Sequence, residues 1–229
     1  TFENGKTNLI IGQSGSGKTV LMKCVVGLLI PEKGELLYDH RNFLTMGKKE
    51  KKALRREMGM IFQSAALFDS MTVLDNVMFP LNMFSSDTLR DRTRRAMFCL
   101  ERVNLIEAKD KFPGEISGGM QKRVAIARAI ALNPQYLFCD EPNSGLDPKT
   151  SLVIDELIQD ITREYNMTTL INTHDMNSVM GIGENILYIY EGRKEWQGNK
   201  DEIMNSTNER LNSFIFASDL FRKVKEANK

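Results

Sequence analysis

The feature that most constrains this chain is a glycine-rich turn near its start, Gly12-Gln13-Ser14-Gly15-Ser16-Gly17-Lys18-Thr19. The turn follows a short apolar run, Asn8–Ile11, and precedes a segment with helical spacing. Glycines at this spacing between a strand and a helix let backbone N–H groups close around phosphate oxygens, and the helix N-terminus adds partial positive charge. The turn therefore predicts a phosphate-binding loop, and a chance glycine-rich turn is disfavoured because both flanking elements are in place.

The side chains at the end of this loop predict a magnesium-bound nucleoside triphosphate. Lys18 is expected to reach the β- and γ-phosphates, and the Thr19 hydroxyl is expected to ligate Mg²⁺. Val20 follows at the start of the helix and completes the set of nucleotide-binding candidates, residues 12–20.

An acidic pair at the end of a later strand matches this loop. The apolar run Tyr136–Cys139 ends on Asp140 and Glu141. At the carboxyl edge of a sheet, Asp140 would hold the magnesium through water, and Glu141 would act as a base or orient the attacking water. The alternative, in which both are turn residues before Pro142, is weakened by the glycine loop.

The order of elements predicts an α/β fold, because apolar strands alternate with helices as in a mostly parallel sheet covered on both faces. The expected strands are Asn8–Ile11, Met58–Phe62, Tyr136–Cys139, Thr168–Asn172 and Asn185–Tyr190. Helical spacing without strands covers Val73–Phe79, Thr88–Val103 and Ser117–Leu132. We therefore expect an α/β core at 1–66 and 133–206, an inserted α-helical subdomain at 67–132, and a helical extension at 207–229. With its glycine loop, this core resembles a P-loop NTPase core of RecA-like type.

Composition limits the partners that this chain can have. Lysine plus arginine (31) nearly equals aspartate plus glutamate (30), and acids interleave the basic runs Lys48–Lys52 and Arg90–Arg95. We expect solvated helix faces there and no nucleic-acid partner. Three cysteines without metal spacing favour a reducing compartment. No apolar run approaches the roughly 18 residues of a membrane span, so any membrane role requires a partner.

A second glycine motif, Ser117-Gly118-Gly119, opens a long apolar helix about a hundred residues later. Ser117 can be an ordinary N-cap, and a Ser-Gly-Gly turn at a helix start is also a ready phosphate site. The motif belongs to an ordered set with Gln63 after an apolar strand, Asp147 just past the acidic pair, and His174 after a further strand.

This ordered set resembles the ATP-binding-cassette (ABC) ATPases over essentially the first two hundred residues. The resemblance implies a homodimer of head-to-tail subunits with ATP between the glycine loop of one and the Ser117–Gly119 turn of the other. It further implies that Gln63 touches magnesium and links to the helical subdomain. Asp147 would brace the dimer, and His174 would contact the γ-phosphate, so Glu141, His174 and Gln63 are the expected catalytic residues.

The sequence departs from the family pattern in three ways. Ile116 and Met120 replace the common leucine and glutamine that flank the Ser-Gly-Gly turn, a change we expect to be tolerated. Asn143 replaces the usual threonine after Glu-Pro. Family members normally begin with further strands carrying an aromatic residue that stacks on adenine, and no such segment precedes Thr1. Phe2 lies too close to the loop to serve, so that residue stays unassigned and weak ATP binding is expected.

Within the family, the segments 63–77 and 115–124 resemble importer-type ATPases and are most similar to the Mla/Mce lipid-trafficking branch. That similarity implies that the chain is cytoplasmic and peripheral at the inner face of the bacterial cytoplasmic membrane, bound to integral membrane permease subunits. The cargo and the direction of transport would be set by those partners. Leu67, Phe68, Met71 and Val73 are candidates for a groove that accepts a short permease helix, and ordinary packing between lobes is the alternative.

Other functions remain open alternatives. An importer for another cargo such as amino acids uses the same ATPase, and soluble cassette ATPases act on DNA or ribosomes. The soluble type is disfavoured because the chain has no heptad run and no second glycine loop. A P-loop kinase or GTPase would leave Ser117–Gly119 unexplained.

The C-terminal segment 208–229 is rich in apolar residues, and we predict that it docks on its own domain or on a neighbouring subunit. These residues are Leu211, Phe214, Ile215, Phe216, Leu220 and Phe221.

Overall fold

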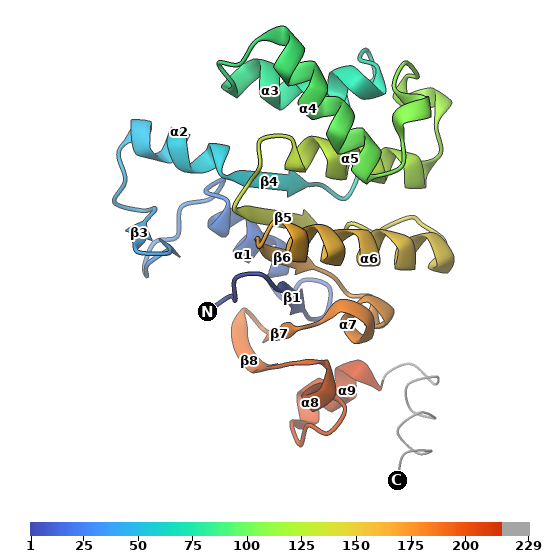
Figure 1. Ribbon diagram of the computed structural model, residues 1–229. Helices are drawn as coiled ribbons and strands as arrows, with labels where there is room; N and C mark the ends of the chain where they lie inside the picture. Colours follow the sequence, from blue (N-terminus) through green and yellow to red (C-terminus); the bar gives the residue numbers. More distant parts are fainter. Residues whose placement is uncertain (217–229) are drawn as a thin grey trace.

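A computed structural model describes residues 1–216 and contains a six-stranded sheet in the order β4-β5-β6-β1-β7-β8 (Figure 1). All neighbouring strands are parallel except β7 and β8. The strands are β1 (Thr7–Ile11), β4 (Met58–Ile61), β5 (Tyr136–Asp140), β6 (Thr168–Asn172), β7 (Asn185–Tyr190) and β8 (Arg193–Gly198). A separate two-stranded sheet pairs β2 (Leu37–Tyr38) with β3 (Arg41–Asn42).

Helices cover both faces of the large sheet. The helices of the described residues are α1 (Lys18–Val25), α2 (Lys48–Arg56), α3 (Val73–Phe84), α4 (Leu89–Arg102), α5 (Gly118–Ile130), α6 (Pro148–Glu164), α7 (Met176–Ile182), α8 (Lys200–Ile203) and α9 (Glu209–Ile215), with 3₁₀ turns at Ile106–Ala108 and Pro113–Glu115. No helix within residues 1–216 combines the length and the apolar character that crossing a membrane requires. This architecture confirms the expected α/β fold with a mostly parallel sheet.

The central strand β1 explains why the sheet forms here. All five of its residues are buried, and neighbouring side chains belong to different cores. Leu9 and Ile11 pack in the core that α3–α7 share, whereas Ile10 packs with α1, α2 and β2. A strand covered on both faces needs a continuous apolar run, which is the pattern of Leu9–Ile11.

The stretch between β4 and β5 contains helices and no strands, as the sequence predicted. Helix α3 packs against α4 and α5, and α5 also packs against β4 and α6. Helices α3 and α4 lie beyond the β4 edge of the sheet, and α8 and α9 lie near its β8 edge (Figure 1). The helical part is therefore tied to the sheet mainly through α5, and the proposed boundaries at 66 and 132 stay a prediction.

Several elements differ from the sequence prediction, which also did not include the strands β2 and β3. The helix expected over Val73–Phe79 continues through Pro80 to Phe84. An internal proline costs about 3 kcal/mol, and burial of Leu81 in the core beyond it offsets part of that cost. Strand β8 was missed because its residues are largely polar and partly exposed, as edge strands often are.

The C-terminal segment docks on its own domain as far as the structure describes it. Helix α9 buries Leu211 and Ile215 in the main core, and Phe214 packs against that core. Leu220 and Phe221 lie outside the described residues.

Candidate functional site

The glycine loop occupies the turn between β1 and α1, and its backbone requires glycine. Gly12 has φ 154° and Gly17 has φ 103°, a region that residues with side chains rarely adopt. A Cβ at Gly12 would also lie 2.4 Å from the Ile189 carbonyl oxygen. The chain can therefore form this concave turn only with glycine at these positions.

Lys18 is the buried cation of the loop. Its side chain is 7% exposed, and its ammonium donates to the carbonyl oxygens of Gly12 (2.9 Å) and Gln13 (3.0 Å). Burial lowers the pKa of Lys18, while the charges of Glu141 and Asp140 oppose that shift. Both carboxylates therefore lie near the ammonium, and an anion entering the loop would find a partly desolvated positive charge.

A hollow of about 630 Å³ opens above the loop, within the size range of ligand sites. It brings the glycine loop together with the acidic strand end and the predicted histidine. Its lining consists of Gly12, Gln13, Ser14, Gly15, Gly17, Lys18, Thr19, Val20, Glu141, His174 and Phe214.

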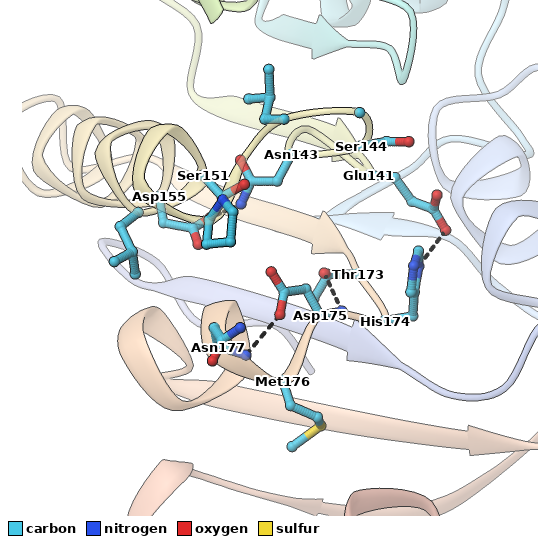
Figure 2. A pocket seen from close by; sticks show the side chains of 14 residues that line it. Glu141, Asn143, Ser144, Ser151, Asp155, Thr173, His174, Asp175, Met176 and Asn177 are labelled. Carbon is cyan, nitrogen blue, oxygen red and sulfur yellow. Dashed lines mark hydrogen bonds and ion pairs between the residues drawn. The ribbon is translucent and has the colours of Figure 1, made fainter. Parts of the chain in front are cut away.

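Glu141 and His174 form a pair at this hollow (Figure 2). The Glu141 Oε1 atom lies 3.1 Å from His174 Nδ1. Glu141 adopts φ 48°, and its N–H donates to the Asn172 carbonyl oxygen at 3.0 Å, which fixes the turn after β5. Two distant segments thus hold one carboxylate at the mouth of the loop.

Asn172 is a site residue that the sequence analysis did not assign. Its side-chain amide donates to Asp140 Oδ1 at 3.0 Å, and the residue is 1% exposed. The sequence signal that could have identified Asn172 is a polar residue at the last position of a buried strand. Asn172 orients the carboxylate that was predicted to act on magnesium.

The oxygen ligands present suit a hard divalent cation. Thr19 lines the hollow beside Lys18, and the Asp140 carboxylate lies near the same ammonium. Hydroxyl and carboxylate oxygens are the ligands that Mg²⁺ prefers. Gln63, the third predicted ligand, instead donates from Nε2 to Ser144 Oγ at 3.0 Å and is not part of the hollow's lining.

The Ser117–Gly119 turn lies in a different hollow, of about 620 Å³, together with Asp147. Ser117 Oγ accepts from the Met120 N–H at 3.3 Å and caps α5, so the N-cap interpretation holds. Asp147 caps α6 by accepting from the Thr150 N–H at 3.0 Å. None of these residues lines the hollow above the glycine loop, so one chain does not bring the two predicted phosphate sites together.

A third hollow, of about 650 Å³, is next to each of the other two and shares lining residues with them. It shares Glu141 and His174 with the hollow above the glycine loop, which we call the loop hollow. It shares Gly145 and Leu146 with the hollow that contains the Ser117–Gly119 turn, which we call the Ser117 hollow. Figure 2 shows Glu141, His174 and Asn143 around it. The three hollows therefore follow one another along the molecule.

Asn143, the residue that replaces threonine, joins a buried polar cluster beside this third hollow. Its amide donates to Asp155 Oδ1 (2.7 Å) and Ser178 Oγ (3.2 Å). Asp155 is 3% exposed, and its burial raises its pKa to about 6, with the hydrogen bonds from Ser178 and Asn143 opposing that shift. The cluster fastens the segment between Glu141 and Asp147 to α6 and α7.

Lys122 is a second residue that the sequence analysis missed. It lies on α5, is 5% exposed, and donates to the Gln63 carbonyl oxygen. Burial lowers the pKa of Lys122, and the charge of Glu141 opposes that shift. Lys122 thus connects the helix that begins at Ser117 to the segment that carries Gln63.

Comparison with known proteins shows which family this chain resembles. A family model described as "ABC transporter" matches residues 1–144. The probable ribonucleotide transport ATP-binding protein mkl of Mycobacterium leprae is 36% identical, over 92% of this chain and 61% of that protein. The chain therefore spans about three fifths of the length of that relative.

Two further relatives differ in their named cargo. The intermembrane phospholipid transport system ATP-binding protein MlaF of Haemophilus influenzae is 36% identical, over 93% of this chain and 81% of that protein. The methionine import ATP-binding protein MetN of Clostridioides difficile is 38% identical, over 88% of this chain and 63% of that protein.

A solved structure shares the fold. It is a dimeric ATP-binding cassette in a post-hydrolysis state with ADP and Pi, with a TM-score of 0.78 and 33% identity. The match covers 87% of this chain and 88% of that one.

The buried Asp155 predicts a pH-dependent stability. Its folded pKa of about 6 lies above the unfolded value of about 3.9, so the folded protein keeps a proton that the unfolded chain releases in this window. The free energy of unfolding should therefore fall by up to about 3 kcal/mol as pH rises from about 4 to about 6. Urea unfolding of Asp155→Asn should lack this decline, whereas Asp160→Asn, an exposed change on the same helix, should keep it. Equal pH slopes in all three proteins would contradict the assignment.

Proposed function

We propose that this chain, which belongs to the ABC transporter family, hydrolyses ATP as the nucleotide-binding subunit of a membrane transporter. The observation that carries the proposal is the loop hollow. It joins a phosphate-binding loop, a buried lysine and the Glu141–His174 pair in one cavity.

The residues of the hollow divide the chemistry between binding and proton handling. Backbone N–H groups of the glycine loop and the Lys18 ammonium bind the phosphates, and α1 adds its N-terminal dipole. Glu141 orients the attacking water or accepts its proton, and His174 holds the Glu141 carboxylate and faces the γ-phosphate. Thr19 and Asp140 would hold Mg²⁺, which supplies charge neutralisation on the phosphates. Gln63 does not line the hollow, and its Nε2 is bonded to Ser144, so only its Oε1 would be available to the metal.

A second copy of the chain supplies the remaining phosphate contacts in this proposal. The Ser117–Gly119 turn lies in a separate hollow, so its backbone N–H groups reach a nucleotide only in a partner's loop. Asp147 shares the hollow of that turn and would brace the two copies. The similarity to a dimeric cassette bound to ADP and Pi supports this arrangement.

A partly apolar groove between the sheet and the helical part suits a permease helix. The groove has a volume of about 390 Å³ and is lined by Arg55, Met58, Gly59, Met60, Phe62, Ala66, Phe68, Phe79, Pro80, Phe84, Arg128, Ala129 and Leu132. Phe62 and Phe68 are each 40% exposed, and the rings of Phe68 and Phe79 lie 4.6 Å apart. Exposed aromatic groups in a groove are typical of surfaces that accept an amphipathic helix.

The structure holds this groove in shape through buried polar contacts. The side chain of Asn76 is bonded to both the backbone N–H (2.9 Å) and the carbonyl oxygen (3.1 Å) of Phe68. Of the residues predicted for the groove, Phe68 lines it, whereas Val73 is fully buried and Leu67 packs on the core. Ordinary packing therefore accounts for Val73 and Leu67. Gln63, a residue predicted for the nucleotide site, lies one residue after Phe62 of the groove.

For the cargo, we propose phospholipid trafficking at the inner face of the bacterial cytoplasmic membrane. Support comes from the MlaF relative, which this chain spans over 81% of its length, against 63% for the MetN relative. The MetN similarity favours amino-acid import as a second candidate. Identification of the permease that copurifies with the chain distinguishes the two, and a nucleic-acid or ribosome partner would contradict both.

Replacing Glu141 tests the hydrolytic role. Glu141→Gln should retain ATP binding and slow hydrolysis at least ~100-fold, because the amide cannot accept the proton of the attacking water. The measurements are nucleotide affinity and phosphate release under single-turnover conditions. Glu101→Gln, an exposed change on α4, should behave as wild type. Wild-type turnover in Glu141→Gln would overturn the assignment.

Replacing Phe68 tests the groove. Phe68→Ala should reduce the amount of copurified permease at least ~10-fold, as loss of a buried aromatic contact does at other interfaces. ATP binding by the chain alone should be unchanged. Met83→Ala is the control, because Met83 is also exposed on α3 and does not line the groove. Equal loss in both variants would show that the groove is not the docking surface.

A further inference from the structure

An aromatic side chain from the C-terminal segment lines the hollow above the glycine loop. Phe214 on α9 contributes to this lining, nearly two hundred residues after the loop in the sequence. Apart from Phe214 and Val20, the lining residues are glycine, polar or charged. Among the described residues that line this cavity, Phe214 is therefore the one apolar aromatic ring, beside the polar imidazole of His174.

The ring of Phe214 is held in place by the sheet. It stacks on Tyr188 of β7, with 5.4 Å between ring centroids and 28° between the planes. Tyr188 is 1% exposed and is paired in register with Ile11, the last residue of β1 before the loop. The support for Phe214 and the strand that leads into the loop are thus direct neighbours.

Helix α9 is anchored on both sides of Phe214. Leu211 is fully buried and Ile215 is 1% exposed, so the two flanking apolar residues fix the rotation of the helix. Arg210 adds an ion pair with Glu195 of β8 at 3.1 Å, and its carbonyl oxygen accepts from the Tyr188 hydroxyl at 3.4 Å. The position of Phe214 is consequently set by the fold.

The phosphates and the base of a nucleotide interact differently with an aromatic side chain. Phosphates are recognised by the loop N–H groups and by Lys18, and an aromatic face offers them no hydrogen bond. The base is the planar, polarisable part, and stacking of a base on an aromatic side chain is worth about 1–3 kcal/mol in nucleic-acid complexes. The same hollow therefore offers polar contacts for the phosphates and an apolar ring for the base of a nucleoside triphosphate.

We propose that Phe214, presented by α9, is a wall of the nucleotide site that contacts the base of the bound nucleoside triphosphate. The proposal rests on the proposed binding of ATP in the glycine loop. It assigns a ligand-contacting role to the C-terminal helix and makes Phe214 a determinant of affinity for nucleotides over base-free polyphosphates.

Titration calorimetry on the full chain tests this with ATP and with inorganic tripolyphosphate, which lacks the base. Phe214→Leu should weaken ATP binding roughly 5- to 100-fold and leave tripolyphosphate binding within about 2-fold. Phe214→Tyr, which keeps the ring, should bind ATP within about 2-fold of wild type. Phe98→Leu, at an exposed phenylalanine on α4, is the matched control and should change neither affinity.

A spectroscopic readout covers the case in which leucine loosens α9. Phe214→Trp should show a change in tryptophan emission on adding ATP, relative to the wild-type signal of Trp196, and no such change with tripolyphosphate. Equal ATP affinity in wild type and Phe214→Leu would overturn the inference. Loss of ATP and tripolyphosphate binding together in that variant would reduce Phe214 to a structural residue and would overturn it too. If wild type bound neither ligand, the proposed nucleotide site itself would fail, and this inference would fail with it.

Discussion

The structure depends on the burial of β1 between two cores. Because Leu9 and Ile11 face one core and Ile10 faces the other, the strand is fixed at the centre of the sheet. The glycine loop starts where this strand ends, so its N–H groups and Lys18 lie at the carboxyl ends of the strands, together with Asp140 and Glu141. Ligands bind at the carboxyl ends of parallel strands, because the N-termini of the following helices meet there.

In the function proposed above, each chain carries two halves of different nucleotide sites. The loop hollow holds Lys18, Glu141 and His174, and the Ser117 hollow holds the second glycine turn and Asp147. The hollow between them is bordered by the segment that Asn143 ties to Asp155 and Ser178. These hydrogen bonds tie the segment between Glu141 and Asp147 to α6 and α7.

The sequence predicted those features that are carried by short continuous segments. The glycine loop, the acidic end of β5 and the apolar strands each depend on neighbouring residues, and the structure contains them with small changes at the ends. Contacts between distant segments were harder to predict from the sequence. Asn172, Lys122 and Phe214 meet their partners through pairing and packing. Of the three, only Asn172 had a local sequence signal, as a polar residue that ends a buried strand. Strand β8 was missed for the same reason, because pairing with β7 rather than apolar periodicity defines it.

The central claim is that a complete nucleotide site requires the loop of one copy and the Ser-Gly-Gly turn of another. Subunit mixing tests it most directly, with Lys18→Ala breaking the loop and Ser117→Arg blocking the turn. Each variant alone should be inactive. In a head-to-tail dimer of the two, one site carries both changes and the other carries neither. An equimolar, re-equilibrated mixture should therefore recover about a quarter of wild-type ATP hydrolysis, since about half of the dimers are mixed and each has one intact site. A mixture with mixed dimers present and no recovered activity would contradict the account, as would full activity of Ser117→Arg alone.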